Sequence, residues 1–286
     1  MGDSKNKKLK ILITGANGQL GRCLLDVAEH YPEYDFHFKT STDLNITSQE
    51  EVNTLFAHEK FDYCINCAAY TAVDKAETDK ENAFLVNAEA VKYLVEACKD
   101  NDTTLIHIST DFVFDGTKST PYTEEDVPNP INVYGASKLK GELYVQQLLN
   151  KYFIIRTSWV YSKYGHNFVK TMLRLGVERD EINVVNDQLG SPTYAGDLAE
   201  IIMKIIISKA TDYGLYHYCN KGEISWYEFA MAIFEAKKID VKVNPILSVD
   251  YIAPAKRPVN TCLNISKISF LLGENIIYDW NSSLLK

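Results

Sequence analysis

A glycine-rich turn near the start of the chain limits the choice of fold more than any other feature. The stretch "ILITGANGQLGRCL" places Gly15, Gly18 and Gly21 between a short apolar run and a helical pattern. In such a unit the glycines permit a tight turn, close approach of a pyrophosphate to the backbone, and close packing of helix on strand. The N–H groups at the start of the helix then face the phosphates. The turn therefore predicts a dinucleotide-binding βαβ unit.

The strand–helix rhythm continues through the first half of the chain. Expected strands are "KILITG", "DFHFKT", "YCINCAA", "TLIHIST" and "YFIIRTSWVY". Helical patterns between them include "TSQEEVNTLFAHE", where Thr47 begins a T-x-x-E capping box, and "NAFLVNAEAVKYLVEACKD". Apolar strands that alternate with amphipathic helices indicate a parallel sheet covered on both faces. We therefore expect an α/β fold with a Rossmann-type doubly wound parallel sheet.

The rhythm loosens beyond residue 161. The pattern predicts strands at "INVVND" and "GLYHYCN", helices at "AGDLAEIIMKIIISKA" and "SWYEFAMAIFEAKK", and a loop at "PILSVDYIAPAKRPVN". We expect a flexible tail over 1–8, a dinucleotide-binding domain over 9–161, and a smaller C-terminal region over 162–286. That region is expected to bind mainly substrate, with some of its elements returning to the Rossmann sheet.

Charge and cysteine content narrow the classes of partner. A net charge of -8 and a pI near 5.3 argue against a nucleic-acid partner, and no apolar run is long enough to cross a membrane. Six cysteines without a secretion signal indicate reduced thiols in a cytoplasmic protein. Cys64 and Cys67 form a C-x-x-C on an expected strand, where positions three apart point to opposite faces. We interpret them as two core thiols.

A second motif suggests acid–base chemistry. The stretch "NVYGASKLK" places Tyr134 and Lys138 one helical turn apart, so the phenol and the ammonium share a face. The expected strand "TLIHIST" ends on Ser109 and Thr110, at the edge where such a sheet binds ligands. Carbonyl reduction needs a proton on oxygen, which Tyr134 would supply if a neighbouring ammonium and an oxidised nicotinamide lowered its pKa. Thr110 would orient the substrate oxygen, and the small residues of "YGASK" would let cofactor and sugar approach closely.

The two motifs together resemble a known superfamily. The spacing G-x-x-G-x-x-G, combined with Tyr-x-x-x-Lys, is similar to the extended branch of the short-chain dehydrogenase/reductases, which acts on nucleotide sugars. The end of the second strand bears on the choice of nicotinamide. Lys39 suits a 2′-phosphate, whereas Asp43 suits an adenosine ribose or adenine. The pattern favours NADP, with NAD also accepted.

Longer stretches resemble the dTDP-4-dehydrorhamnose reductase family, among them "NCAAYTAVDKAE", "ISTDFVFDG", "RTSWVY" and "VVNDQLGSPTYAGDLA". This resemblance covers most of the chain. It implies NAD(P)H-dependent reduction of the 4-keto group of dTDP-6-deoxy-L-lyxo-4-hexulose to dTDP-L-rhamnose. The implied catalytic residues are Thr110, Tyr134 and Lys138. The expected cofactor-binding residues are Gly15, Asn17, Gly18, Gln19, Leu20, Lys39, Asp43, Leu44, Ala68, Ala69, Tyr70 and Ser109, with Tyr134 and Lys138 shared. The expected substrate-binding residues are Phe112, Trp159, Asn167 and Arg257.

The sequence departs from the family pattern at one position. Some members join two subunits through Mg2+ held by glutamates, one of which lies just beyond the phosphate loop. Cys23 stands at that place here and is a poor ligand for a hard cation. We therefore expect no metal, while a homodimer held by other contacts stays among the expectations.

Two other functions remain as alternatives. The first is another nucleotide-sugar epimerase or dehydratase of the same branch. Dehydratases typically carry Asp-Glu after the threonine, and here Phe112 follows Asp111. The second is a non-catalytic NADP-binding regulatory subunit, similar to one that serves methionine adenosyltransferase. The intact Thr, Tyr and Lys argue against it.

Overall fold

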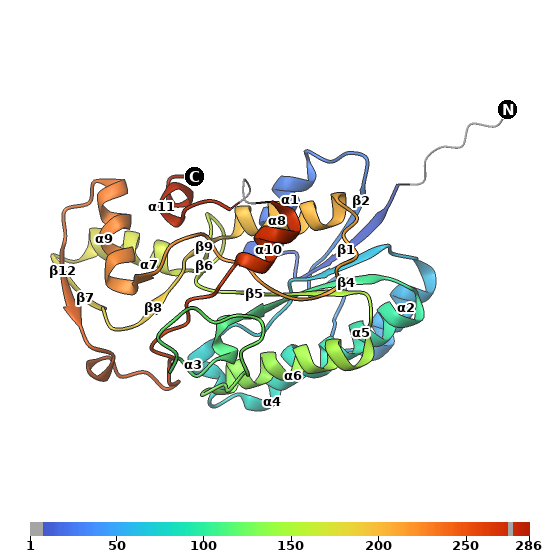
Figure 1. Cartoon of the computed structure of the whole chain (residues 1–286), viewed down its shortest axis with the longest axis horizontal. Helices are drawn as coiled ribbons and strands as arrows, with labels where there is room; N and C mark the ends of the chain where they lie inside the picture. Colours follow the sequence, from blue (N-terminus) through green and yellow to red (C-terminus); the bar gives the residue numbers. More distant parts are fainter. Residues whose placement is uncertain (1–7, 274–276) are drawn as a thin grey trace.

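The structure is a computed structural model that describes residues 8–273 and 277–286. Its main body is a six-stranded parallel sheet with the strand order β2-β1-β3-β4-β5-β10 (Figure 1). The predicted fold class, a Rossmann-type doubly wound sheet, is confirmed. The six strands are β1 (Lys10–Thr14), β2 (Asp35–Lys39), β3 (Tyr63–Asn66), β4 (Thr104–Thr110), β5 (Tyr152–Thr157) and β10 (Gly214–His217).

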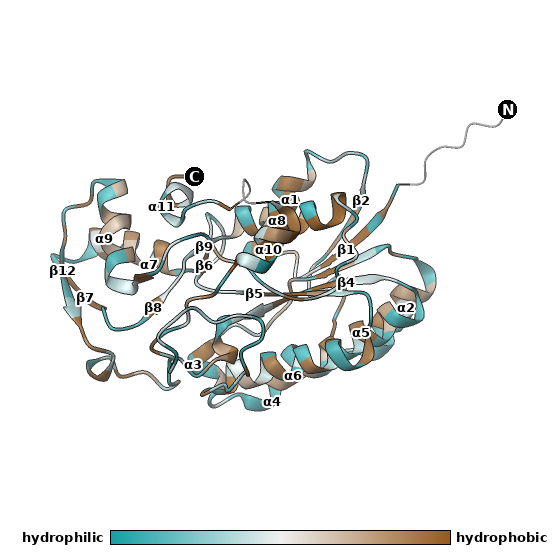
Figure 2. Cartoon of the chain, in the orientation of Figure 1, coloured by the Kyte–Doolittle hydropathy of each residue, from teal (hydrophilic) through white to brown (hydrophobic). Residues whose placement is uncertain are grey.

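Helices cover both faces of the sheet (Figure 1). On one face lie α1 (Gln19–Ala28) and α8 (Ala195–Ile207), and on the other lie α2 (Gln49–His58), α5 (Ala90–Asp100) and α6 (Val133–Leu148). Alternate residues of β1 serve the two faces: Ile11 and Ile13 pack in the core under α1 and α8, whereas Leu12 packs under α2 and α5. The strands are accordingly hydrophobic along their length (Figure 2). Shorter helices are α3 (Val73–Ala76), α4 (Lys80–Phe84) and α10 (Ser266–Leu272).

The strand order places a crevice at one edge of the sheet. Strand β1 pairs with β2 on one side and with β3 on the other, so the chain reverses its direction of winding between β1 and β3. The loops after these two strands diverge at their carboxyl ends. Ligands of doubly wound sheets bind at such a switch point.

A second group of elements lies at the left of Figure 1. Its strand pairs are β6 (Val160–Tyr161) with β9 (Thr193–Tyr194), β7 (Glu181–Val185) with β12 (Lys242–Ile246), and β8 (Leu189–Gly190) with β11 (Ile224–Ser225). Its helices are α7 (Phe168–Glu178), α9 (Trp226–Lys237) and α11 (Trp280–Leu284). Phe229 lies at its centre and contacts aromatic rings from α7, α11 and the β5–β6 connection.

Several local predictions were wrong in detail. The expected strand over "YFIIRTSWVY" is split into β5 and β6, because Trp159 adopts a left-handed backbone with φ of 47°. The cap of α2 is Ser48, whose hydroxyl accepts from the Glu51 N–H, and not Thr47. Within the expected loop "PILSVDYIAPAKRPVN", Pro245 and Ile246 complete β12. A proline is tolerated there because β12 pairs with β7 alone.

The expected helix over "NAFLVNAEAVKYLVEACKD" contains a π-helical turn (Leu85–Glu89) between α4 and α5. Short turns follow β4 (Asp111–Val113) and β12 (Ser248–Asp250). The predicted flexible tail over 1–8 lies outside the described residues, except for Lys8. None of the described helices combines the length and apolarity needed to cross a membrane.

Candidate active site

The glycine turn is built as a close approach of two strand ends. Gly15 has φ of 66°, and a Cβ at this position would lie 2.6 Å from the Ala68 backbone nitrogen. A Cβ on Gly21 would lie 2.5 Å from the Gly15 carbonyl oxygen. Gly18 caps α1 without any side-chain hydrogen bond to the first turn. The first N–H groups of α1 are therefore left for an anion.

A cavity of about 310 Å³ opens at this turn, between the loops that follow β1, β2 and β3. Six residues of the predicted cofactor set line it: Gly15, Asn17, Gly18, Leu44, Ala68 and Ala69. Sequence reasoning missed the other six: Ser41, Asn45, Ile46, Thr47, Cys67 and Val86. Most of these follow β2 or β3, so the strand-end rule could have found them. Cys67 was interpreted as a core thiol, and its place in this lining corrects that interpretation.

Other members of the predicted cofactor set lie outside this lining. Leu20 is a core residue that is 7% exposed. Asp43 turns its carboxylate back to the Thr40 N–H and hydroxyl, at 2.9 and 2.6 Å, and these bonds lower its pKa. Tyr70 donates its hydroxyl to Asp79, and Lys39 ends β2 beside Thr14. The Leu20 side chain is therefore turned into the core, and its expected part in cofactor binding, in the first turn of α1, stays a prediction.

The catalytic candidates converge beside the end of β4. Thr110 ends this strand, and its hydroxyl donates to Asp111 Oδ1 at 2.9 Å. Lys138 on α6 is 2% exposed and donates its ammonium to the Ile108 carbonyl at 2.6 Å. Tyr134, one turn earlier on α6, is half-buried with its ring edge-on to Phe112.

The pKa of Tyr134 does not move in the expected direction. Partial burial and the neighbouring Asp111 raise it to about 12, while the Thr110 hydroxyl opposes the shift. Burial also lowers the pKa of Lys138 to about 8, although Glu142 and Cys67 raise it. In this structure the Lys138 ammonium is directed at the Ile108 carbonyl and does not offset the effect of burial on the pKa of Tyr134. Tyr134 is protonated at neutral pH.

The small residues of "YGASK" serve packing. A Cβ on Gly135 would lie 2.0 Å from the Phe112 carbonyl oxygen, so this glycine lets α6 meet the turn after β4. Ser137 is fully buried, donates to the Tyr134 carbonyl and accepts from Asn87 in the π-helical turn. The expectation that these positions make room for cofactor and sugar was wrong for both residues.

The Ser109 hydroxyl is engaged within the protein. Ser109 is 4% exposed, and its hydroxyl donates to Glu142 Oε1 at 2.5 Å. Neighbouring side chains of a strand point to opposite faces, so Ser109 and Thr110 diverge. Sequence placed both at the strand end but did not separate their faces.

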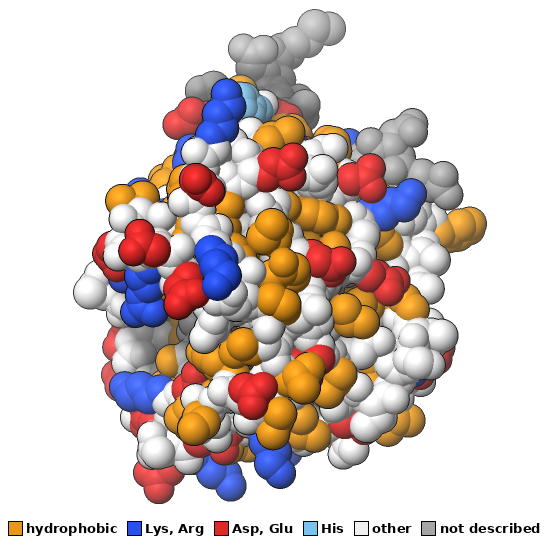
Figure 3. All heavy atoms as spheres, turned by 90° about the vertical axis from the view of Figure 1, so that its left-hand side faces the viewer, with side chains coloured by type: hydrophobic (Ala, Val, Ile, Leu, Met, Phe, Trp, Pro, Cys, Tyr) orange, Lys and Arg blue, Asp and Glu red, His pale blue; other side chains and the backbone are white. Residues whose placement is uncertain are grey.

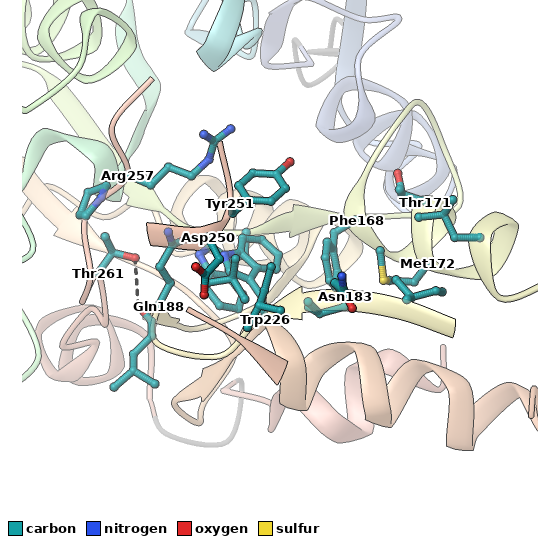
Figure 4. A pocket seen from close by; sticks show the side chains of 18 of the residues that line it. Phe168, Thr171, Met172, Asn183, Gln188, Trp226, Asp250, Tyr251, Arg257 and Thr261 are labelled. Carbon is teal, nitrogen blue, oxygen red and sulfur yellow. Dashed lines mark hydrogen bonds between the residues drawn. The ribbon is translucent and has the colours of Figure 1, made fainter. Parts of the chain in front are cut away.

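A second cavity, of about 710 Å³, lies between the sheet and the second group of elements, which contains α7 and α9. Three predicted substrate residues line it: Phe112, Trp159 and Arg257. Trp159 stacks on Trp226 with ring centroids 3.4 Å apart. Arg257 comes from the loop after β12 and donates to Asp74 Oδ2 at 2.8 Å. Figure 4 shows Arg257 and Tyr251 at one end of this cavity, with Thr171 and Met172 of α7 at the other. Hydrophobic side chains gather in the middle of this end of the molecule, among charged ones (Figure 3).

Asn167, the fourth predicted substrate residue, caps α7. Its amide oxygen accepts from the Lys170 N–H, and its amide nitrogen donates to Gln19 Oε1 at 2.8 Å and to the Ser162 carbonyl at 2.8 Å. Both ends of the amide are therefore engaged within the protein. The structure gives Asn167 and Gln19 a role in joining α7 to α1, and Asn167 is not among the residues that line the larger cavity, so its expected contact with substrate stays a prediction.

Asp111 was quoted in sequence only as half of an incomplete pair. It is 2% exposed, and its Oδ2 has no hydrogen-bond partner among the described residues. Burial raises its pKa to about 6, although the nearby Thr261 and Thr110 hydroxyls lower it. Thr110 is a predicted catalytic residue, and a carboxyl with a raised pKa is often found at functional sites.

Cys23 lies in the core under α8 and is 3% exposed. Burial and the nearby Asp26 raise the pKa of its thiol to about 11. A buried, protonated thiol is not placed to hold a cation between two subunits.

Comparison with known proteins identifies the family. The family model described as RmlD substrate binding domain matches residues 9–286. The dTDP-4-dehydrorhamnose reductase of Aggregatibacter actinomycetemcomitans is 43% identical over 285 residues, covering 96% of this chain and 97% of its own length. Crystal structures of dTDP-4-dehydrorhamnose reductases from Clostridium acetobutylicum, and from Bacillus anthracis in complex with NADP, match with TM-scores of 0.93 and 0.92. Both are 43% identical and cover 97% of this chain, and the match covers 97% and 98% of theirs. With a family model over nearly its full length and relatives this similar, the chain belongs to the dTDP-4-dehydrorhamnose reductase family.

Proposed function

We propose that this protein reduces the 4-keto group of dTDP-6-deoxy-L-lyxo-4-hexulose with NADPH, giving dTDP-L-rhamnose. The observation that carries the proposal is the position of Tyr134 and Lys138 on one face of α6, each near a residue that lines one of the two cavities. Tyr134 packs edge-on to Phe112, which lines the larger cavity, and Lys138 lies near Cys67, which lines the smaller one. A proton donor at this junction can reach a carbonyl held in one cavity beside a nicotinamide held in the other.

The smaller cavity fits the cofactor. Side chains on Gly15 or Gly21 would clash with the backbone that shapes this turn, and the start of α1 is uncapped, as a pyrophosphate requires. NADPH bound there supplies the hydride. We assign its phosphates to Gly15, Asn17 and Gly18, and its adenosine half to the loops after β2 and β3, where Leu44, Ala68 and Ala69 lie.

Side chains of the protein supply the proton that the keto oxygen needs. Tyr134, whose pKa of about 12 keeps it protonated, donates its phenolic proton to the keto oxygen as the hydride arrives at carbon. Thr110 orients that oxygen from the end of β4. Lys138 holds the nicotinamide ribose and stabilises the phenolate that is left behind.

The larger cavity accommodates the nucleotide sugar. Phe112 lies nearest Tyr134 and packs beside the sugar, with Trp159 on its other side. Arg257 offers a planar cation to the diphosphate, and its pairing with Asp74 fixes the guanidinium.

A coupled assay tests the proposal. The protein is incubated with dTDP-glucose, the upstream dehydratase and epimerase, and NADPH, and we expect NADPH oxidation with formation of dTDP-rhamnose. Omitting the epimerase is the control, and it should abolish product formation. Absence of product in the complete mixture, or NAD that stays bound through gel filtration, contradicts the proposal and favours the oxidising sugar chemistry of an epimerase or dehydratase.

We further propose that NADPH is preferred and that Lys39 contributes to this preference at the end of β2, beside Ser41 in the cavity lining. Replacing Lys39 by Asp introduces a charge that repels a 2′-phosphate. The ratio of kcat/KM for NADPH to that for NADH should fall by more than tenfold, about 1.4 kcal/mol. A Lys60→Asp variant makes the same charge change beyond the end of α2 and should leave the ratio unchanged. If Lys39→Asp also leaves it unchanged, Lys39 takes no part in the choice of cofactor.

A further inference from the structure

A buried ion pair lies beneath the catalytic helix. Glu142 of α6 and Arg156 of β5 are 1% and 2% exposed. They meet through two hydrogen bonds, Nε to Oε1 at 2.9 Å and Nη2 to Oε2 at 2.6 Å. The Ser109 hydroxyl donates to Oε1 as well. Two buried charges are costly to desolvate, and such a pair is weak evidence for stability by itself. The pair therefore calls for a functional explanation.

The ion pair is continuous with the catalytic residues. Tyr134, Lys138 and Glu142 are spaced four apart along α6, so they lie on one face of the helix. Lys138 donates to the carbonyl of Ile108, and Glu142 accepts from the next residue of β4, Ser109. Two adjacent residues of β4 thus bind the ammonium and the carboxylate, which lie on the same face of α6.

The surroundings of Lys138 make the nearby carboxylate of Glu142 important for its charge. Its ammonium is buried, and burial lowers its pKa to about 8. A small further decrease in this pKa would therefore remove the charge at physiological pH. The groups that face it from other elements are Cys67 after β3 and His107 on β4, and Arg156 of β5 lies behind Glu142. Burial raises the pKa of Cys67 and lowers that of His107, so both are neutral at physiological pH. On its own helix Lys138 has the neutral phenol of Tyr134 and the carboxylate of Glu142.

We propose that Glu142, held in place by Arg156 and Ser109, is a positioning residue that keeps the Lys138 ammonium charged and aligned for the cofactor ribose. The proposal rests on the function proposed above, in which Lys138 contacts NADPH. A charged ammonium donates stronger hydrogen bonds to ribose hydroxyls than a neutral amine does. Removing the negative charge of Glu142 makes Lys138 lose its proton at lower pH.

The test uses Glu142→Gln, which keeps the shape of the side chain and removes its charge. The Kd for NADPH is measured by fluorescence at pH 6.5 and at pH 8.5, together with the pH profile of kcat/KM. We expect binding within about twofold of wild type at pH 6.5, binding about tenfold weaker at pH 8.5, and an alkaline limb shifted down by about one pH unit. Glu89→Gln is the matched control. It also removes one carboxylate charge, at a residue that accepts from the Tyr144 hydroxyl of α6, and it should change neither the Kd for NADPH nor the pH profile.

Glu142→Gln leaves Arg156 without its full partner and can unfold the protein. The double variant Glu142→Leu with Arg156→Met removes both charges, and replacements of this type are often neutral for stability. It should show the same selective loss of binding at pH 8.5. If either folded variant binds NADPH equally at both pH values, or weakens equally at both, Glu142 is a structural residue only and the inference is wrong. Failure of the wild type to bind NADPH at any pH would instead overturn the proposed function.

Discussion

Tyr134 and Asp111 are neighbours in the catalytic site, and their surroundings raise the pKa of both. For Tyr134 the result suits an acid that delivers a proton during reduction. For Asp111 it means that the ionised form is destabilised at neutral pH. The two residues therefore call for different measurements: a kinetic one for Tyr134, and a pH-dependent stability for Asp111.

Replacing Tyr134 by Phe should lower kcat by about 10²–10⁴-fold, because the lost hydroxyl serves proton transfer. The Kd for NADPH should stay within a few-fold of wild type, since the ring and its contact with Phe112 remain. Steady-state kinetics and cofactor titration separate the two effects. Tyr144→Phe is the matched control. Tyr144 lies further along α6, and its hydroxyl donates to Glu89. If Tyr134→Phe keeps more than about a tenth of the activity, another group supplies the proton.

Asp111→Asn should stabilise the protein at neutral pH while lowering its activity. The folded-state pKa of about 6 lies above the unfolded value near 3.9, so the folded state holds the proton more tightly. The contribution of Asp111 to stability is therefore lost as pH rises from about 4 to about 6. Two pKa units correspond to about 3 kcal/mol. We expect a gain of about 1–3 kcal/mol in the free energy of unfolding at pH 7.5 and little gain at pH 4.

Asp115→Asn is the control with the opposite sign, measured in the same urea titrations. Hydrogen bonds from Thr117, Asn129 and Tyr122 lower the pKa of Asp115, so its ionised form stabilises the fold above the unfolded pKa. Asp115→Asn should therefore destabilise the protein at pH 7.5. Equal stability of wild type and Asp111→Asn at both pH values would show that Asp111 is not strained by burial.

At the scale of elements, the site depends on how closely α6 meets its neighbours. The π-helical turn carries Asn87, whose amide bonds to both backbone groups of Tyr70 and to the Ser137 hydroxyl. This links the loop after β3, which lines the smaller cavity, to the helix that carries Tyr134. An irregular turn inside a helix is often found at functional sites, and here it lets one side chain join two elements.

Gly135→Ala tests the contact between α6 and the turn after β4. The new methyl group would lie 2.0 Å from a backbone oxygen of Phe112, which cannot move aside as a side chain can. We expect a loss of about 1–3 kcal/mol in stability and a fall in kcat of at least about tenfold, because Tyr134 shifts with the helix. Thermal unfolding and steady-state kinetics measure both effects. Lys140→Ala at an exposed position of α6 should change neither; a stable, active Gly135→Ala variant would mean that α6 can be displaced without consequence.

At the scale of the whole molecule, we expect that neither activity nor assembly depends on a metal ion. Cys23 stands where some relatives carry a bridging glutamate, and it is buried in the core. Exchanging Mg2+ for EDTA should leave both activity and oligomeric mass unchanged, because hard cations need oxygen ligands. Sizing with light scattering and the coupled assay check this. Dissociation or loss of rate in EDTA, restored by Mg2+, would show that carboxylates elsewhere hold a metal.

The sequence by itself determined the fold class, the cofactor turn and the positions of Thr110, Tyr134 and Lys138. These features depend on backbone geometry over a few residues: period 2 in strands, four-residue spacing along a helix, and glycines where two chain segments touch. The strand-end rule then brought the loops after β1, β3 and β4 to one edge without any knowledge of distant contacts. The division of the chain at residue 161 stays a prediction, although β10 and α8 do join the Rossmann sheet and its helices.

The tertiary structure alone decided what surrounds each side chain. Ser109 bonds to Glu142, Asn167 donates to Gln19, and Gly135 packs against Phe112. Each of these partners is more than 20 residues away along the chain. The pKa of Tyr134 rises for the same reason, since burial and the position of Asp111 are properties of the folded chain. Local spacing sets which residues share a face, but desolvation and long-range contacts set how they behave once they are there.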